Sequence, residues 1–244
     1  MRTRLSWAFV ALILLPLWGC DLDDGYSLGD YWITTATIEK GDVSPYVIVT
    51  DNGDRLFPSS TAIPWFETRD QQRVWVNFTI LGDANGEFDH YVKVNNMSEI
   101  LTKGVLELTP ENADSIGNDP VRISDYWFTG DFLTIMFSYS GGGAIHYINL
   151  VQDVNNPVDD QGRPVLLFRH NRKDDPANYA LYGTVSINLY DLRVDGQTSV
   201  SIVLKSTPFA GEDPVDVVLE YNYGTGEVQQ VNRRVSRDDT AIIK

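Results

Sequence analysis

Apolar and polar residues alternate along several short segments of this chain, and this period of two constrains its fold more than any other feature. Residues 74–80 read Val-Trp-Val-Asn-Phe-Thr-Ile, and similar alternation recurs at 184–189, 199–204 and 215–221. Successive side chains of a β-strand point to opposite faces, so each segment has one apolar and one polar face. Such strands are typical of antiparallel sheets with one wet face. The body of the chain is therefore predicted to be all-β.

Turn-forming residues separate these segments. Residues 51–54 read Asp-Asn-Gly-Asp and predict a tight hairpin between two short strands. Three glycines at 141–143, the Asp-Gly pair at 195–196 and the Gly-Thr-Gly triplet at 224–226 also fall between β-rich runs. Residues 155–162 predict a longer polar loop.

The strongest boundary signal is the stretch 109–120, which is rich in Pro, Asn, Asp and Gly and predicts a linker. Residues 30–108 have the length and strand number of an OB-like five-stranded barrel. Residues 121–235 have those of an antiparallel β-sandwich, and a polar tail follows at 236–244. The segment 96–108 is ambiguous, and one interpretation is a short helical turn at 98–101 that leads into a strand at 104–108.

The first nineteen residues have the layout of an export signal, with two arginines ahead of a short apolar run at 5–17. That run is shorter than the roughly 20 residues that span a bilayer. It ends in Leu-Trp-Gly-Cys, which resembles a lipobox, and Cys20 is the only cysteine of the chain. We expect residues 1–19 to be removed and the Cys20 thiol to be acylated, because the thiolate is the nucleophile of that reaction. The alternative is an ordinary secretory signal in which the cysteine is incidental.

Residues 20–29 form an acidic tether after this cysteine. The sequence Asp-Leu-Asp-Asp at 21–24 resembles the surface-export signal of Bacteroidetes lipoproteins, which predicts a surface-exposed outer-membrane lipoprotein. The periplasmic face is the alternative. Loss of Arg2 and Arg4 with the leader lowers the formal net charge from −15 to −17. Because this charge repels phosphate groups, we expect no nucleic-acid partner and expect the acyl chains to provide membrane attachment.

Two segments of the first domain carry a family resemblance. Residues 30–40 read Asp-Tyr-Trp-Ile-Thr-Thr-Ala-Thr-Ile-Glu-Lys, and residues 46–58 run from Tyr46 to Pro58 through the Asp-Asn-Gly-Asp turn. Together they resemble the N-terminal domain of the NigD-like lipoproteins of Bacteroidetes. The resemblance implies an OB-type barrel followed by a β-sandwich, and a gene cluster linked to a bacteriocin. That family carries no catalytic motif, so no active-site residue is transferred.

A search for catalytic and metal-binding patterns favours a protein that is not an enzyme and has no cofactor. The three histidines, His90, His146 and His170, lie far apart in sequence and are interpreted as strand residues rather than metal ligands. No Gly-x-Ser-x-Gly motif is present, and the acidic pairs at 159–160 and 174–175 fall in predicted loops.

The polar stretch 153–160 is the best candidate for a calcium loop, because Asp and Asn supply the oxygen ligands that this ion prefers. It lacks the glycine at the sixth position and the glutamate at the twelfth position of an EF-hand loop. A solvated loop is therefore the favoured interpretation, and no metal site is predicted.

Two further features nominate surface residues. Trp65 and Phe66 stand in a loop between predicted strands and are candidate ligand contacts, although a role as a plug at the open end of the barrel is favoured. Ser115 and Thr240 each follow an aspartate and precede an apolar residue, which resembles the acceptor pattern of Bacteroidetes O-glycosylation.

These observations predict an envelope-anchored, non-catalytic interaction module that binds a protein or glycan, with a bacteriocin-related role implied by the family resemblance alone. The alternative is an accessory or assembly subunit of a surface appendage or a transport complex. An exposed strand edge that accepts a donor strand would favour the alternative.

Overall fold

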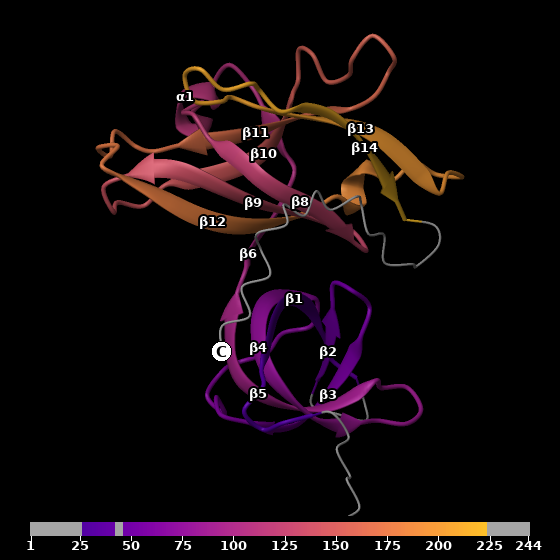
Figure 1. Ribbon diagram of the computed structural model, residues 1–244. Helices are drawn as coiled ribbons and strands as arrows, with labels where there is room; N and C mark the ends of the chain where they lie inside the picture. The colour runs from indigo at the N-terminus through magenta and orange to yellow at the C-terminus, as the bar shows by residue number, and fades with distance from the viewer. Residues whose placement is uncertain (1–25, 42–45, 224–244) are drawn as a thin grey trace, which may run out of the picture.

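The computed structural model describes residues 26–41 and 46–223 of the 244-residue chain. It consists of two β bodies joined by one extended segment (Figure 1). The predicted signal peptide, Cys20, the turn at 224–226, Thr240 and the polar tail lie outside these residues. Within them, neither helix is long and apolar enough to cross a membrane.

The N-terminal body is a closed barrel of five strands in the order β1-β2-β3-β5-β4, which confirms the predicted OB-like domain. The pairing of β3 with β5 is parallel, and the other pairings are antiparallel. The strands are β1 (Trp32–Glu39), β2 (Val47–Thr50), β3 (Arg55–Thr61), β4 (Gln72–Asp83) and β5 (His90–Glu99).

The barrel core follows the alternation read from the sequence. Val74, Val76, Phe78 and Ile80 of β4 all point inward and are buried. The predicted hairpin joins β2 to β3, and Gly53 lies in its turn with a φ of 98°, a conformation that glycine adopts at little steric cost.

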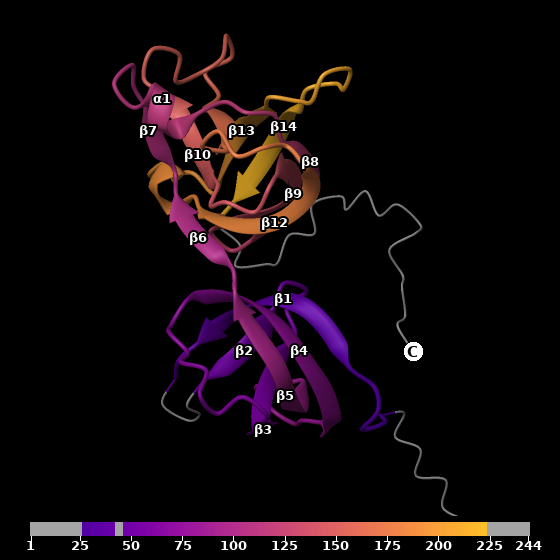
Figure 2. The same ribbon diagram turned by 90° about the vertical axis from the view of Figure 1, so that its left-hand side faces the viewer.

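The C-terminal body is a β-sandwich of two sheets, in the orders β14-β13-β11-β10-β7 and β6-β12-β9-β8. Figure 2 shows the two sheets facing each other above the barrel. The strands are β6 (Leu101–Gly104), β7 (Leu106–Leu108), β8 (Arg122–Thr129), β9 (Phe132–Gly141), β10 (Tyr147–Asp153), β11 (Val165–Asn171), β12 (Tyr179–Asn188), β13 (Ser199–Ser206) and β14 (Asp216–Asn222). Two short helices, α1 (Ala113–Ile116) and η1 (Tyr190–Leu192), lie in the connections.

The sandwich core lies between the sheets. Val185, Ile187 and Leu189 point into it, as the alternation at 184–189 predicts. The loops predicted at 141–143 and 155–162 connect β9 to β10 and β10 to β11.

The predicted domain boundary at 109–120 is wrong. Residues 101–108 form β6 and β7, which pair in parallel with β12 and β10 and so belong to the sandwich. The chain passes from β5 into β6 through a single residue, Ile100, as Figure 2 shows. The helical turn considered at 98–101 is therefore extended strand.

The stretch 109–120 is part of the sandwich for a physical reason. Its polar residues form helix α1 and a loop fixed to β11, rather than a solvated linker. The Asn171 side-chain amide donates to the carbonyl oxygens of Asp114 and Ser115, at 3.2 and 2.9 Å. The backbone N–H of Asp119 donates to the carbonyl of His170 at 2.8 Å. Turn-forming composition does not by itself separate a linker from an ordered connection.

Candidate functional site

A buried ion pair joins the two domains. The Arg73 guanidinium is fully buried and donates to both carboxylate oxygens of Asp51, at 2.5 and 2.6 Å. Asp51 also accepts the Thr35 hydroxyl and, from the sandwich, the Trp127 indole N–H, each at 2.6 Å. Burial acts to raise the pKa of Asp51, but the hydrogen bonds and the charge of Arg73 outweigh it and hold that pKa below its ordinary value.

Arg73 also reaches directly into the sandwich. Its Nη2 donates to the Thr134 hydroxyl at 3.0 Å and its Nε to the Ser186 hydroxyl at 3.3 Å. Its guanidinium carbon lies 5.5 Å from the ring centroid of Phe132. Within the barrel, Nη1 donates to Thr37 at 2.9 Å. Because both domains supply partners to one buried charge, their relative orientation is fixed at this point.

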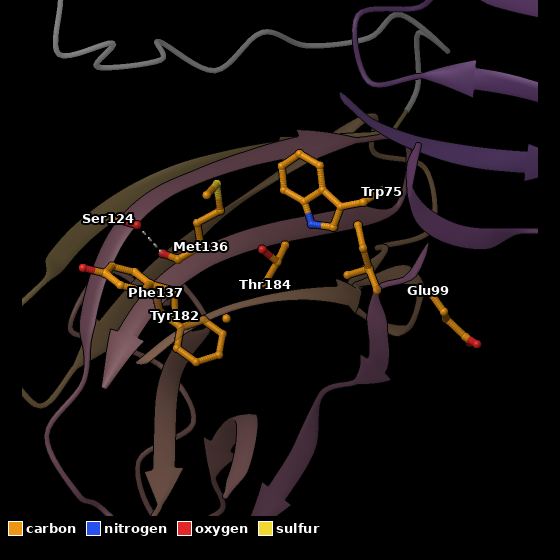
Figure 3. A pocket seen from close by; sticks show the side chains of 9 residues that line it. Trp75, Glu99, Ser124, Met136, Phe137, Tyr182 and Thr184 are labelled. Atoms are coloured by element: carbon orange, nitrogen blue, oxygen red, sulfur yellow. Dashed lines mark hydrogen bonds between the residues drawn. The ribbon is translucent and has the colours of Figure 1, made fainter. Parts of the chain in front are cut away.

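An open pocket of about 350 Å³ lies beside this ion pair, where the barrel meets the sandwich (Figure 3). It is lined from the barrel side by Trp75, Glu99 and Ile100, and from the sandwich by Ser124, Met136, Phe137, Tyr182, Gly183 and Thr184.

The alternation of side chains along β4 determines which barrel residue lines the pocket. Val74 and Val76 of β4 point into the barrel, so Arg73 and Trp75 point out of it on the same face. Arg73 lies beneath the sandwich, whereas Trp75, two residues on, is partly exposed and extends over the sandwich sheet in Figure 3. The strand that carries the ion pair therefore also positions the indole.

The alternation of side chains along β12 likewise determines which sandwich residues line the pocket. On β12, Tyr182, Thr184 and Ser186 share the outer face of the four-stranded sheet. Ser186 is buried against Arg73, while Tyr182 is 82% exposed. Figure 3 shows Thr184 between Trp75 and the Phe137–Tyr182 pair. The barrel thus covers the sheet face around Ser186, and the pocket lies next to it, around Thr184 and Tyr182.

Gly183 shapes the inner side of the same strand. A Cβ atom at this position would lie 2.6 Å from the tip of the Phe137 ring. Glycine is therefore needed for the Phe137 ring to pack beneath the strand, and a larger residue would displace part of the pocket wall.

A second polar cluster lies in the sandwich, at the end of β11 and the start of β10. His146 and His170 are hydrogen-bonded through Nδ1 and Nε2 at 2.8 Å, and the Nε2 of His146 lies 3.0 Å from Asp175. The Nδ1 of His170 lies 3.1 Å from the Pro120 carbonyl oxygen. The side chains of His146 and Asp175 are 3% and 8% exposed. Sequence separation concealed this contact, which the pairing of β10 with β11 creates.

The two ends of this cluster contact groups whose hydrogen-bonding roles are known. The Pro120 carbonyl only accepts, so His170 donates to it through Nδ1. Asp175 also accepts the backbone N–H groups of residues 142, 143 and 144. It is therefore a carboxylate, and the Nε2 of His146 lies within hydrogen-bond distance of it.

The pKa directions agree with this assignment. The hydrogen bond from His146, followed by those from the 142–144 backbone, lowers the pKa of Asp175 despite its burial. Burial lowers the pKa of His170, the hydrogen bond to Pro120 opposes that shift, and the charge of His146 reinforces it. No set of three or more His, Cys, Asp or Glu side chains suited to a metal ion occurs in residues 26–41 and 46–223. Every member of the cluster has an internal partner, so it acts as a structural clamp.

The surface residues nominated from the sequence lie apart from the pocket. The plug interpretation is wrong for Trp65, which is 74% exposed in the loop after β3, whereas Phe66 is partly buried and packs against the barrel core. Neither residue lines the pocket. Sequence reasoning missed Trp75 and Tyr182 because both stand in alternating strands, where an outward aromatic residue carries no special signal.

Ser115 is exposed on α1, where its hydroxyl donates to the Asn112 carbonyl at 2.8 Å. In the loop weighed for calcium, Asp153 accepts from the Asn155 backbone at 2.9 Å, and Asp159 accepts from Arg163 at 2.7 Å. These carboxylates are thus engaged within their own loop.

The fold and the site define a two-domain β protein, an OB barrel locked to a β-sandwich with a pocket at the junction. The chain belongs to the NigD-like family. Residues 35–100 match the NigD-like N-terminal OB domain, and residues 104–221 match the NigD-like C-terminal β-sandwich domain. The family boundaries agree with the junction at Ile100.

Solved structures share this architecture. A protein of Parabacteroides distasonis described as toxin-related is 34% identical, with a TM-score of 0.67 over 80% of this chain and 94% of that one. A protein of unknown function from Bacteroides vulgatus is 25% identical, with a TM-score of 0.65 over 80% and 91%. A NigD-like immunity protein from Bacteroides caccae, at 18% identity, shares the fold with a TM-score of 0.63 over 80% and 99%. A comparison with curated proteins found no match.

Proposed function

We propose that this protein is an envelope lipoprotein whose folded body binds a protein or glycan partner in the pocket between its domains and performs no chemistry on it. The observation that carries the proposal is the pairing of Trp75 with Tyr182 across an open pocket at a fixed domain junction. Aromatic rings with one apolar face and one polar group are typical of binding sites.

The junction supports this role energetically. Trp75 follows the buried Arg73 by two residues, and its strand pairs with β1 at Thr35, which donates to Asp51. A wall held in this way loses little conformational freedom when a ligand binds, so more of the contact energy appears as affinity.

Anchoring through Cys20 is supported by the sequence, in which a short apolar leader ends at the only cysteine. An acidic tether follows, and we propose the cell surface of the outer membrane as the location, with its periplasmic face as the alternative. Acylation of the Cys20 sulfur and of the freed amine would supply enough apolar chain for stable attachment.

A bacteriocin-related role is one form of this proposal. Its support is the Parabacteroides distasonis neighbour, which is 34% identical to this chain and is described as toxin-related.

The pocket is tested by capturing partners from intact cells with the tagged full-length protein. A double variant, Trp75→Ala with Tyr182→Ala, removes both pocket rings. A matched variant, Trp65→Ala with Tyr179→Ala, removes two rings that are 74% and 67% exposed elsewhere. We expect the wild type and the matched variant to retain the same partner and the pocket variant to lose it. Equal retention by all three would refute the site.

The anchor has a separate test. Cys20→Ala removes the nucleophile that accepts the lipid, so we expect the protein to move from the membrane fraction to the soluble fraction. Fractionation and immunoblotting measure the shift. Continued membrane retention of this variant would contradict acylation at Cys20.

A further inference from the structure

The charge of the pocket limits what it accepts. Glu99 is the single charged residue in its lining, and its carboxylate forms an ion pair with Arg69. In Figure 3 the Glu99 side chain points away from Trp75. No lining side chain is left to neutralise an anionic or a cationic ligand, and burying an unpaired charge is costly. The lining therefore suits an uncharged ligand.

The size of the pocket separates a small ligand from a protein surface. A volume of about 350 Å³ falls at the lower end of the 300–1,000 Å³ typical of small-molecule sites. A stable protein interface needs about 800 Å² from each partner, centred on a broad apolar core. The pocket instead offers a short concave segment that holds one or two rings of a chain-like ligand.

The pocket lining combines apolar surface with hydroxyl groups. Trp75 supplies a flat apolar face, and the methyl groups of Met136 and Thr184 lie near it. Hydroxyl groups that both donate and accept come from Thr184, Tyr182 and Ser124, the last already donating to the Met136 carbonyl at 3.1 Å. A sugar ring has the complementary pattern, because its C–H groups form an apolar face and its hydroxyls project around the rim.

We propose that the pocket binds a neutral oligosaccharide, with the apolar face of one sugar ring stacked on the indole of Trp75 and its hydroxyls bonded to Thr184 and Tyr182. This inference rests on the proposed function and narrows it from a protein or glycan to an uncharged glycan. The net charge of the chain, −15, adds a long-range term against acidic sugars.

The test is a titration of the purified full-length protein with neutral gluco-, xylo-, manno- and galacto-oligosaccharides of two to six units. Oligogalacturonates serve as the acidic counterpart. The part of the tryptophan fluorescence change that is lost in Trp75→Ala reports on Trp75, and calorimetry gives the dissociation constant. The Trp65→Ala background removes one exposed indole that lies outside the pocket. We expect at least one neutral series to bind, and the oligogalacturonates to bind at least tenfold more weakly.

Variants then locate the sugar. We expect Trp75→Ala to weaken binding at least tenfold, Trp75→Phe to retain part of the affinity, and Tyr179→Ala to match the wild type. Thermal unfolding checks that each variant is folded. The proposal is overturned if no neutral series binds at millimolar concentration, or if Trp75→Ala binds as tightly as the wild type.

The outcome also separates this inference from the function on which it rests. If no neutral sugar binds while the pocket variant still loses a partner captured from cells, the sugar assignment fails and the binding pocket stands. If the pocket variant loses nothing in either experiment, both fail.

Discussion

The Arg73–Asp51 cluster at the domain junction and the His146–Asp175 cluster in the sandwich both bury a basic side chain against a carboxylate. They differ in the basic group, since a guanidinium stays charged at any pH that a protein tolerates, whereas imidazole is the side chain whose charge ordinarily changes between pH 5 and 8. They differ also in reach. The first cluster joins two domains, and the second joins the turn after β9 to the loop after β11.

This difference indicates which cluster is sensitive to a change of pH. The junction sets the orientation of Trp75 relative to Tyr182, and its two charged groups, Arg73 and Asp51, keep their charges from neutral to mildly acidic pH. The sandwich clamp holds residues 142–144 and no part of the pocket lining. Because burial lowers the pKa of His170, we expect acid to destabilise the clamp at a higher pH than the junction.

Removing the junction cation should have the largest effect. Arg73→Ala leaves the Asp51 carboxylate buried without its partner, and the expected loss is about 3–5 kcal/mol of unfolding free energy. Chemical denaturation followed by fluorescence measures it. Arg55→Ala breaks a pair with Glu39 that is more than one third exposed, and should cost about 0–1 kcal/mol. Equal losses for the two variants would contradict the role of the buried pair.

Removing a histidine of the clamp should have a smaller effect. His146→Ala takes away one hydrogen-bond partner each from Asp175 and His170, and the expected loss is about 1–3 kcal/mol. His90→Ala is the matched control, because His90 pairs at 3.1 Å with an Asp83 side chain that is 73% exposed. Denaturation curves compare the two. A clamp variant as stable as its control would show that the cluster adds nothing.

Acid should change the free energy of unfolding by a smaller amount, and the pH of that change should differ between the two clusters. Because burial lowers the pKa of His170 from its ordinary 6.5, the unfolded chain binds more protons below that pH, and stability falls as pH falls. This group contributes at most about 1.4 kcal/mol per pH unit. Asp51 and Asp175 have pKa values lowered from 3.8, so their contributions are lost only in stronger acid.

The measurement is the unfolding free energy at pH 7.5 and 5.5 for the wild type and His170→Gln. The charged neighbours of His170 are His146, Asp119 and Arg172, and all three are kept in this variant. We expect the variant to show a weaker loss between these pH values. An unchanged slope would place the acid-sensitive group elsewhere.

Much of the fold could be predicted from local patterns, and the failures have physical causes. Alternation at Val74 and Phe78 identified a core strand, because one face of a barrel strand must be apolar. The segment 109–120 was misassigned because turn residues that form α1 and its flanking loops have the same composition as a linker.

The site was less accessible from sequence. The outward face of β4 is visible as a polar and aromatic face, but nothing local says that Asp51 and Trp127 cover one end of it and leave Trp75 open. His146 and His170 are likewise brought together by strand pairing, over a separation that no spacing rule detects. Both clusters are formed by residues that lie far apart in sequence, and local secondary-structure propensities do not encode such contacts.

The most direct test of the account is hydrogen–deuterium exchange of the wild-type protein with and without its captured partner. Binding in the pocket should protect amides in residues 72–76 and 182–186, which form its two walls, and leave the Trp65 loop unchanged. Protection confined to the Trp65 loop or to the far sheet of the sandwich, with the pocket strands unaffected, would contradict the account.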